Sequence, residues 1–145
     1  MNEQLPDEQS KRFIAVLNKK TDVGRLMNAL GHMTAGLVGG FHDPAAMCFL
    51  EYRDKDSGIH PNISHFPFIV LRADNANQIR TVRNECLRRS IPFGDFTSTM
   101  TVGSSQEQVE RTANTPEVEL DYWGIVMFGG TDELREFTKK FSLFQ

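Results

Sequence analysis

Three polar side chains that could carry chemistry fall on one side of a single predicted helix. Arg25, Asn28 and His32 are three and then four residues apart, so they lie nearly in line on the surface of a helix. A guanidinium binds a phosphate or a carboxylate with two hydrogen bonds, an amide donates to a developing oxyanion, and an imidazole accepts a proton. This row of residues is therefore the best candidate site in the chain.

A second set of polar side chains alternates with apolar ones over residues 93–102. Asp95, Thr97, Thr99 and Thr101 occupy every second position, which predicts one strand face that carries a carboxylate and three hydroxyls. Threonine is also a good strand former, so an ordinary half-exposed strand is the alternative interpretation.

Two lysines, Lys19 and Lys20, separate a predicted strand from the helix that carries the first row. Ligand crevices of α/β proteins lie at the carboxyl ends of strands, and the amino end of a helix favours anions. We therefore expect a small or phosphate-bearing ligand in a crevice at the start of this helix. The residues expected to hold it are Lys19, Lys20, Gly24, Arg25 and Asn28.

The helix itself is predicted over Lys19–Gly40 from apolar residues at three-and-four spacing. Thr21 or Asp22 is expected to cap its start, and Gly39 or Gly40 to end it in the left-handed conformation. The apolar residues expected to face a core are Val23, Leu26, Met27, Leu30, Met33 and Leu37.

Apolar and alternating runs predict the remaining elements. Strands are expected over 12–18, 45–53, 67–71, 93–102 and 117–128, the second of them buried, and helices over 19–40, 74–89, a short stretch from 104, and 131–144. This order favours an α/β fold, a single three-layer sandwich with a mixed sheet of four to five strands flanked by about four helices. Residues 1–10 are polar and aperiodic, so we expect a disordered tail before one domain over residues 11–145.

Composition narrows the function classes. A chain of 145 residues with a formal net charge of −3 argues against a general nucleic-acid surface, and we expect no DNA partner. The sequence shows no secretory leader and no apolar run of about 20 residues, so a cytoplasmic protein with no membrane partner is expected. Cys48 and Cys86 are interpreted as small buried thiols, and no cofactor is expected.

Two further clusters have ordinary explanations. Four arginines on the helix over 74–89 are interpreted as a solvated face, with phosphate binding as the alternative; they are Arg80, Arg83, Arg88 and Arg89. His42, His60 and His65 lie near Asp43 in the sequence, but their spacing fits no standard ligand pattern. We interpret these histidines as loop or surface residues and expect no metal.

Two stretches carry a resemblance to known proteins. VGRLMNALGHMTAGL after an apolar strand and YWGIVMFGGTDELREFTKKFSLF near the C-terminus resemble peptidyl-tRNA hydrolase type II. The chain is still more similar to an uncharacterised bacterial family of that fold, catalogued as domain of unknown function two thousand. The matching segments are Gly24 with Asn28, His60–Ile63 before Pro67–Leu71, Asp95–Thr97, and Gly124–Phe144.

The resemblance implies a peptidyl-tRNA hydrolase type II-like fold, a homodimer, and tRNA or a small anionic ligand as partner. The hydrolases open their first helix with Gly-Lys and then show Gln and His; the matching residues here are Gly24, Arg25, Ala29 and His32. Arginine keeps the charge of the lysine but does not readily lose a proton. The Asp-Ala-Gly segment of the hydrolases, followed by Thr, has its nearest counterpart in Asp95, Thr97 and Thr99.

Two functions remain open. In a hydrolase, His32 or Asp95 would activate or orient a water, and Asn28 or a threonine, Thr97 or Thr99, would donate to the oxyanion. Direct attack by water on an ester such as that of peptidyl-tRNA is expected, because no nucleophilic serine or cysteine motif is present. In a binding protein the same crevice would hold a ligand without turnover, and the missing lysine and glutamine favour this interpretation.

Overall fold

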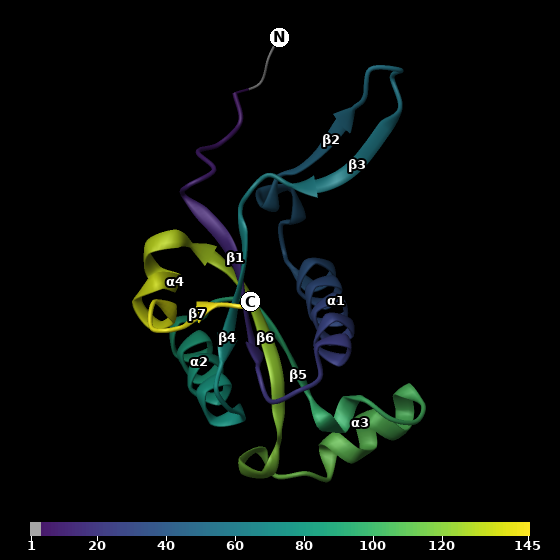
Figure 1. Cartoon of the computed structure of the whole chain (residues 1–145), viewed down its shortest axis with the longest axis vertical. Coiled ribbons are helices and arrows are strands. Elements are labelled where there is room, and N and C mark those ends of the chain that lie inside the picture. The colour runs from purple at the N-terminus through teal and green to yellow at the C-terminus, as the bar shows by residue number, and fades with distance from the viewer. Residues whose placement is uncertain (1–3) are drawn as a thin grey trace.

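A five-stranded sheet organises the chain in the computed structural model, which describes residues 4–145 (Figure 1). The strand order is β5-β6-β1-β4-β7. The strands are β1 (Lys11–Asn18), β4 (Phe68–Ala73), β5 (Phe93–Thr97), β6 (Tyr122–Gly130) and β7 (Ser142–Leu143). β1 pairs with β4 in parallel, and the other pairs are antiparallel. The predicted α/β class with a mixed sheet is therefore confirmed.

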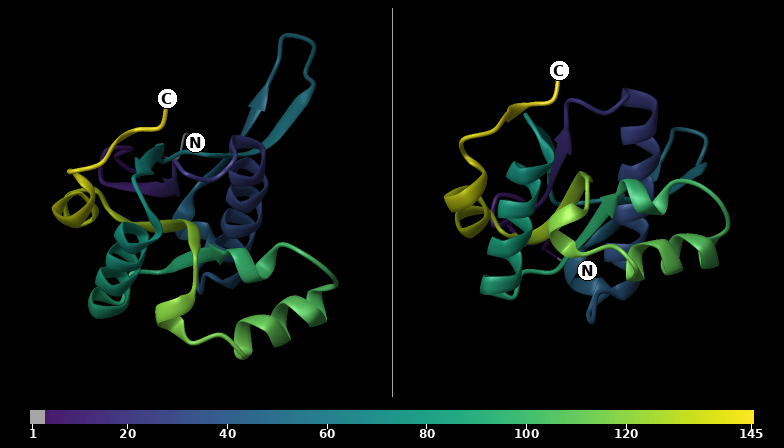
Figure 2. Two further views of the ribbon diagram at one scale, coloured as in Figure 1. Left: turned by 60° about the horizontal axis from the view of Figure 1, so that its bottom comes forward. Right: turned by 90° about the horizontal axis from the view of Figure 1, so that it is seen from below.

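Helices cover both faces of this sheet and make three layers. α1 (Val23–Gly40) packs on one face, and α2 (Ala76–Arg89) and α4 (Thr131–Thr138) pack on the other (Figure 2). α3 (Ser105–Ala113) lies outside these layers, against the segment that follows β5. Because β1 is buried on both faces, its sequence is a nearly continuous apolar run. None of the helices within residues 4–145 is long and apolar enough to cross a bilayer.

A hairpin projects from the body of the protein (Figure 1). It follows the short helix η1 (Pro44–Met47) and consists of β2 (Phe49–Arg53) and β3 (Ile59–Ser64), which form a separate two-stranded sheet. The prediction of a buried strand over 45–53 is therefore wrong. Part of the apolar run serves the core instead, since Met47 of η1 is fully buried in the cluster that contains Leu37 and Phe66, while most of β2 is exposed.

Both strands at the β5 edge are shorter than predicted. β5 ends at Thr97 and continues as the short helix η2 (Ser98–Met100), and β6 begins after η3 (Glu117–Glu119). The pairing shifts between Phe96 and Thr97, and Ser98 N donates to Asp121 O at 3.0 Å, which closes the strand pair. The predicted single strand over 93–102, with Asp95, Thr97, Thr99 and Thr101 on one face, is therefore wrong.

The ends of α1 agree with prediction on one side only. Asp22 caps its start by accepting Arg25 N at 3.4 Å, as predicted. The helix runs through Gly40 to an extended Phe41, so the predicted left-handed glycine is wrong. Val23 and Met27, predicted to face the core, are exposed, because the helix buries the line that includes Leu26, Ala29, Met33 and Leu37.

The C-terminal helix is also shorter than predicted. α4 ends at Thr138, and the following residues form β7 at the edge of the sheet. The N-cap is Gly130 rather than Thr131, whose hydroxyl instead donates to Gln9 O at 2.7 Å. Residues 1–3 of the predicted disordered tail lie outside the described residues. Residues 4–10 contain no helix or strand, and disorder of the tail stays a prediction.

Candidate functional site

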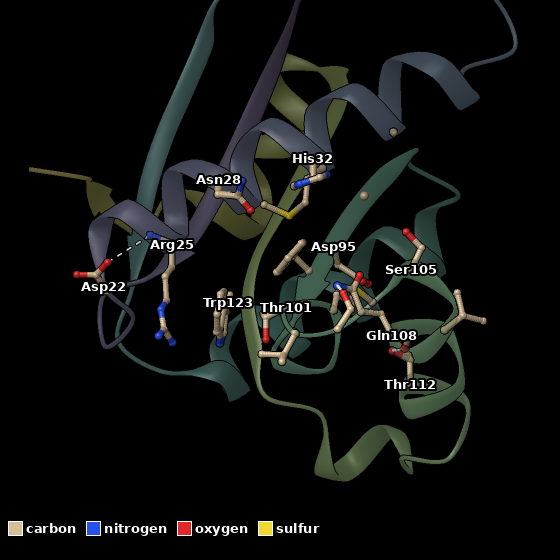
Figure 3. Close-up of a pocket in the computed structure, with 18 of the residues that line it drawn as sticks. Asp22, Arg25, Asn28, His32, Asp95, Thr101, Ser105, Gln108, Thr112 and Trp123 are labelled. Carbon is tan, nitrogen blue, oxygen red and sulfur yellow. Dashed lines mark hydrogen bonds between the residues drawn. The ribbon is translucent and has the colours of Figure 1, made fainter.

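The polar row predicted from helical spacing lies on α1 and faces a pocket (Figure 3). The chain enters α1 through a tight turn in which Thr21 N donates to Asn18 O at 3.0 Å. Because α1 packs its apolar line on the sheet, Arg25, Asn28 and His32 lie outside the core, and all three border the pocket. The sequence therefore brings these three side chains to one surface.

The pocket has a volume of about 1160 Å³ and lies between α1, β5, η2 with the loop after it, and α3 (Figure 3). Helix α1 contributes Gly24, Arg25, Asn28, His32 and Met33; β5 contributes Gly94, Asp95 and Phe96; the loop and α3 contribute Met100–Gly103, Ser105, Gln108, Val109 and Thr112; and β6 contributes Trp123. Pockets for small ligands typically occupy about 300–1,000 Å³. This pocket is therefore large enough for a sizeable ligand.

Aromatic side chains form the floor of the pocket, and two glycines lie where α1 packs on the sheet beside it. The rings of Phe96 and Trp123 lie 5.7 Å apart, and the imidazole of His32 lies 6.1 Å from the Phe96 ring. A Cβ at Gly94 would lie 3.0 Å from Met33 O, and a Cβ at Gly124 would lie 3.0 Å from Met33 Cε of the same helix. Glycine at these positions therefore lets α1 pack closely on β5 and β6.

Arg25 is the cation of the pocket. Its guanidinium carbon lies 5.9 Å from the centre of the Trp123 ring, at the outer range of a cation–π contact. No carboxylate within residues 4–145 forms an ion pair with it. The carboxylate of Asp22, which borders the same pocket, caps the helix through Arg25 N. Among residues 4–145, the charge of Arg25 is therefore not neutralised by a carboxylate partner.

Asp95 borders the pocket but is held from the other side of the sheet. Its Oδ2 accepts a hydrogen bond from Arg83 Nε of α2 at 2.9 Å, and only 17% of its side chain is exposed. Burial raises the pKa of Asp95, and the positive charge of Arg83 acts in the opposite direction.

The buried Tyr122 hydroxyl has no hydrogen-bond partner among the described residues, and burial raises the pKa of this hydroxyl.

Two predicted site threonines, Thr97 and Thr99, are buried rather than lining the pocket. Their hydroxyl oxygens lie 2.6 Å apart, and Thr99 Oγ1 lies 2.8 Å from Thr112 Oγ1 of α3. Arg111 of α3 adds hydrogen bonds to the carbonyls of Thr99 and Val102. These hydrogen bonds hold α3 against η2, and α3 forms one wall of the pocket.

The two lysines predicted at the crevice lie outside the pocket lining. Lys19 forms an ion pair of 2.9 Å with Asp74, just before α2, and Lys20 is exposed. The buried Asn18 fixes this turn, because its amide donates to Tyr122 O and its oxygen accepts Lys20 N. Of the predicted ligand-binding residues, the pocket thus brings together Gly24, Arg25 and Asn28 but not the lysines.

The arginines of α2 are engaged in the protein itself. Arg80 binds Glu117 and the carbonyl of Leu120, and Arg89 bridges Glu85 and Glu136. Hydrogen bonds from Arg88 and Arg89 lower the pKa of Glu85 to about 2. These contacts account for the basic helix face without a phosphate ligand.

The histidines outside α1 do not converge. His60 Nε2 lies 2.9 Å from Asp54 Oδ2, His65 Nε2 lies 2.7 Å from Pro6 O, and the His42 ring lies 4.7 Å from the Phe41 ring at an interplanar angle of 51°. Within residues 4–145, no three side chains with metal-binding groups gather in one place.

The two cysteines differ in burial. Cys86 is fully buried, and burial raises the pKa of its thiol to about 12, whereas Cys48 is partly exposed.

Several lining residues had no clear signal in the sequence. Trp123 opens the apolar run WGIVMF, which predicts a strand in the interior of the sheet. Its ring nevertheless forms part of the pocket floor. Gln108 and Val109 belong to a short polar helix predicted from a capping box. The sequence feature that could have indicated this residue is that it is the single tryptophan of the chain, because aromatic side chains commonly line ligand pockets.

Comparison with protein families gives one match that spans nearly the whole chain. A family model described as "Protein of unknown function (DUF2000)" matches residues 11–145. The comparison with curated proteins finds no match.

Comparison with solved structures supports the fold. The structure of the protein of unknown function Atu0240 from Agrobacterium tumefaciens superposes with a TM-score of 0.80. It shares 16% sequence identity, and the match covers 94% of this chain and 98% of that chain. At this identity the similarity shows the fold alone.

Proposed function

The chain belongs to the DUF2000 family of proteins of unknown function, and we propose that it binds an anion-bearing ligand in the pocket between α1, β5 and α3. The observation that carries the proposal is that the Arg25 guanidinium, which has no ion-pair partner among residues 4–145, lies over Trp123 in the same pocket as Phe96. An apolar floor with few convergent polar groups is the usual composition of a ligand site. Asn28 and His32 supply further hydrogen-bonding groups on the same wall.

The proposed ligand has two parts. An apolar or aromatic part contacts Phe96 and Trp123, and a phosphate or carboxylate contacts Arg25, for which a two-pronged hydrogen bond is the strongest geometry. The carboxylate of Asp22 at the same rim disfavours an anion placed against the helix amides. The anion is therefore assigned to the guanidinium rather than to the amino end of α1.

Phenyl phosphate is a suitable first probe because it combines a ring with a phosphate. In an NMR titration, the amides of α1 and the Trp123 indole should shift, and Arg25→Ala should weaken binding about tenfold, or ~1.4 kcal/mol. Arg53→Ala, which removes an exposed arginine of the hairpin, serves as the matched control. Equal affinity in the Arg25 and Arg53 variants would exclude this site.

A second candidate function is hydrolysis of an ester, as in peptidyl-tRNA, on a peptidyl-tRNA hydrolase type II-like fold. The favouring observation is that His32 and Asp95 border the same pocket as Arg25. In this mechanism His32 or Asp95 accepts a proton from a water whose oxygen forms a bond to the ester carbonyl carbon. The ester C–O bond then breaks, and the same group returns the proton to the leaving hydroxyl oxygen, which gives a free carboxylic acid and an alcohol. Asn28 would donate to the oxyanion, and Arg25 would bind a phosphate of the substrate.

The assay is release of the peptidyl group from an N-blocked aminoacyl-tRNA, with His32→Ala and Asp95→Asn run beside the natural sequence. Each substitution should lower the rate by at least 100-fold, the usual contribution of an acid–base group. Full activity in a variant removes that residue from the mechanism. No turnover by the natural sequence favours binding without catalysis.

We also propose a homodimer that acts in the cytoplasm. The support is a set of exposed apolar side chains on the projecting hairpin, namely Phe49, Tyr52, Ile59 and Ile63. An isolated two-stranded hairpin is marginally stable in water, so contact with a second copy would stabilise it. Sedimentation showing a monomer at micromolar concentration would contradict this proposal.

A further inference from the structure

The two edges of the main sheet differ in how they are protected. One edge is β7, a strand of only two residues, and short edge strands are a common protection against unwanted pairing. The other edge is β5, which has five residues, and no further strand of residues 4–145 pairs with it. Residues Gly94, Asp95 and Phe96 of this edge border the pocket.

The main-chain groups of β5 alternate between its neighbour and this open edge. Phe128 N donates to Pro92 O at 3.2 Å, and the register then places Gly94 opposite Val126 and Phe96 opposite Gly124. In an antiparallel ladder, every second residue exchanges hydrogen bonds with its partner, and the residues between them direct N–H and C=O to the other side. The N–H and C=O of Asp95 are therefore directed to the open edge.

The space beside this edge is bounded by α3, whose main contacts are with η2 rather than with β5. The hydroxyl contact between Thr99 and Thr112 and the hydrogen bonds of Arg111 hold α3 at that position. The pocket of about 1160 Å³ therefore lies along the edge, and an added strand would need to lie about 4.8 Å from β5.

Side chains of an added strand would alternate between the two faces of the sheet. On the α1 face they would meet Phe96, Trp123 and Arg25, and on the α2 face the Asp95–Arg83 pair. An apolar side chain suits the aromatic floor. A side-chain carboxylate suits Arg25, since side chains rather than chain ends project from a strand toward a sheet face.

We propose that the ligand of this pocket is an extended peptide segment of another protein, which adds as a strand to the edge of β5 and presents a side-chain carboxylate to Arg25. This inference rests on the proposed binding function of the pocket. Main-chain hydrogen bonds at the edge supply affinity, and the alternate side chains facing α1 supply selectivity.

The test uses a defined set of hexapeptides with a fluorophore on the N-terminal amine and an amide at the C-terminus. Each has one Glu and two of Val or Phe at alternate positions and Thr elsewhere. Binding is measured by fluorescence polarisation. The best binder is then resynthesised with a single N-methyl group at each amide in turn. Affinity should fall roughly fivefold at every second amide and little at the amides between, because only alternate amides pair with β5.

Two further readouts distinguish a strand from any other bound form. Hydrogen exchange of the Asp95 amide should slow at least tenfold when the peptide binds. Replacing the peptide Glu by Gln should weaken binding about tenfold to the natural chain and to Arg53→Ala, but little to Arg25→Ala.

Several outcomes overturn the inference. They are an N-methyl scan without alternation, unchanged exchange at Asp95, and binding that requires a free C-terminal carboxyl group in place of the amide. If no hexapeptide binds while phenyl phosphate does, the peptide assignment fails and the proposed binding function stands. If neither probe binds, both fail.

Discussion

The arginines on the two faces of the sheet differ in whether they form ion pairs. On the α2 face, Arg80, Arg83 and Arg89 each form an ion pair with a carboxylate. On the α1 face, Arg25 forms none with the described residues, and it lies with Asn28 and His32 at a pocket. The arginines of the α2 face therefore stabilise the fold, whereas Arg25 on the α1 face has no carboxylate partner among residues 4–145, which is the basis of the ligand site proposed above. Basic residues on two helices of one protein thus have different roles, which only their neighbours distinguish.

The largest expected effect is on the α2 face, at the Arg83–Asp95 pair. Arg83→Met should lower the free energy of unfolding by about 2 kcal/mol at pH 7, because it leaves a largely buried carboxylate without its partner. Urea denaturation measures this change. Arg88→Met, at a largely exposed arginine, and Arg25→Met should each change stability by less than about 0.5 kcal/mol. A large loss in Arg25→Met would break the distinction between the two faces.

The decrease in unfolding free energy caused by Arg83→Met should also depend on pH. Burial raises the pKa of Asp95 in the folded protein, so folding favours the protonated carboxyl group. The contribution of this group to the free energy of unfolding is therefore fully present below pH about 4 and is lost as the pH rises. Without Arg83 this pKa should rise further. The difference in unfolding free energy between Arg83→Met and the natural chain should therefore grow from pH 4 to pH 7. A constant difference would show that Asp95 is not the group responsible.

A smaller effect is expected at the wall of the pocket. Thr99→Val removes the hydroxyl between Thr97 and Thr112 and should cost about 1 kcal/mol in unfolding free energy. It should also speed hydrogen exchange in α3 without changing exchange in α2. Thr81→Val, which removes an exposed hydroxyl of α2, is the control and should cost less than about 0.5 kcal/mol. Unchanged exchange in α3 would mean that Arg111 alone holds the helix.

The smallest effect is expected at Asp22, where cap and pocket meet. Asp22→Asn should leave stability nearly unchanged, since asparagine caps as well as aspartate, and should raise affinity for phenyl phosphate two- to threefold by removing a repelling charge, or ~0.5 kcal/mol. Asp22→Ala should raise affinity similarly but lower the unfolding free energy by about 1 kcal/mol. Unchanged phenyl phosphate affinity in both variants would place the bound anion away from this rim.

Local patterns predicted the α1 row well. Spacing along a helix fixes which residues share a side, so Arg25, Asn28 and His32 could be assigned to one surface without knowledge of the partner elements. The layers of the sheet were also predictable, because β1 and β6 are too apolar for any position but a buried one. The matching family model agrees with the resemblance drawn from the sequence to a family of unknown function.

The opposite wall was not predictable in the same way. Alternation over 93–102 predicts a strand, but the chain leaves the sheet at Thr97, because the shift in pairing and the bond from Ser98 to Asp121 depend on a segment distant in the sequence. Thr97 and Thr99 became buried links to α3 rather than site residues. Lys19 likewise pairs with Asp74, a contact that spacing alone does not indicate.

The position of β1 in the sheet has a consequence for how the protein folds. This apolar strand lies between β4 and β6, and the hydrogen bond from Asn18 to Tyr122 joins residues 104 apart in the sequence. During synthesis, β1 therefore emerges long before one of its two neighbours exists. Non-local strand pairing is intrinsically slow, and an unpaired apolar strand is prone to aggregate. We infer that the nascent chain depends on α1 and β4 to shield β1 until β6 arrives.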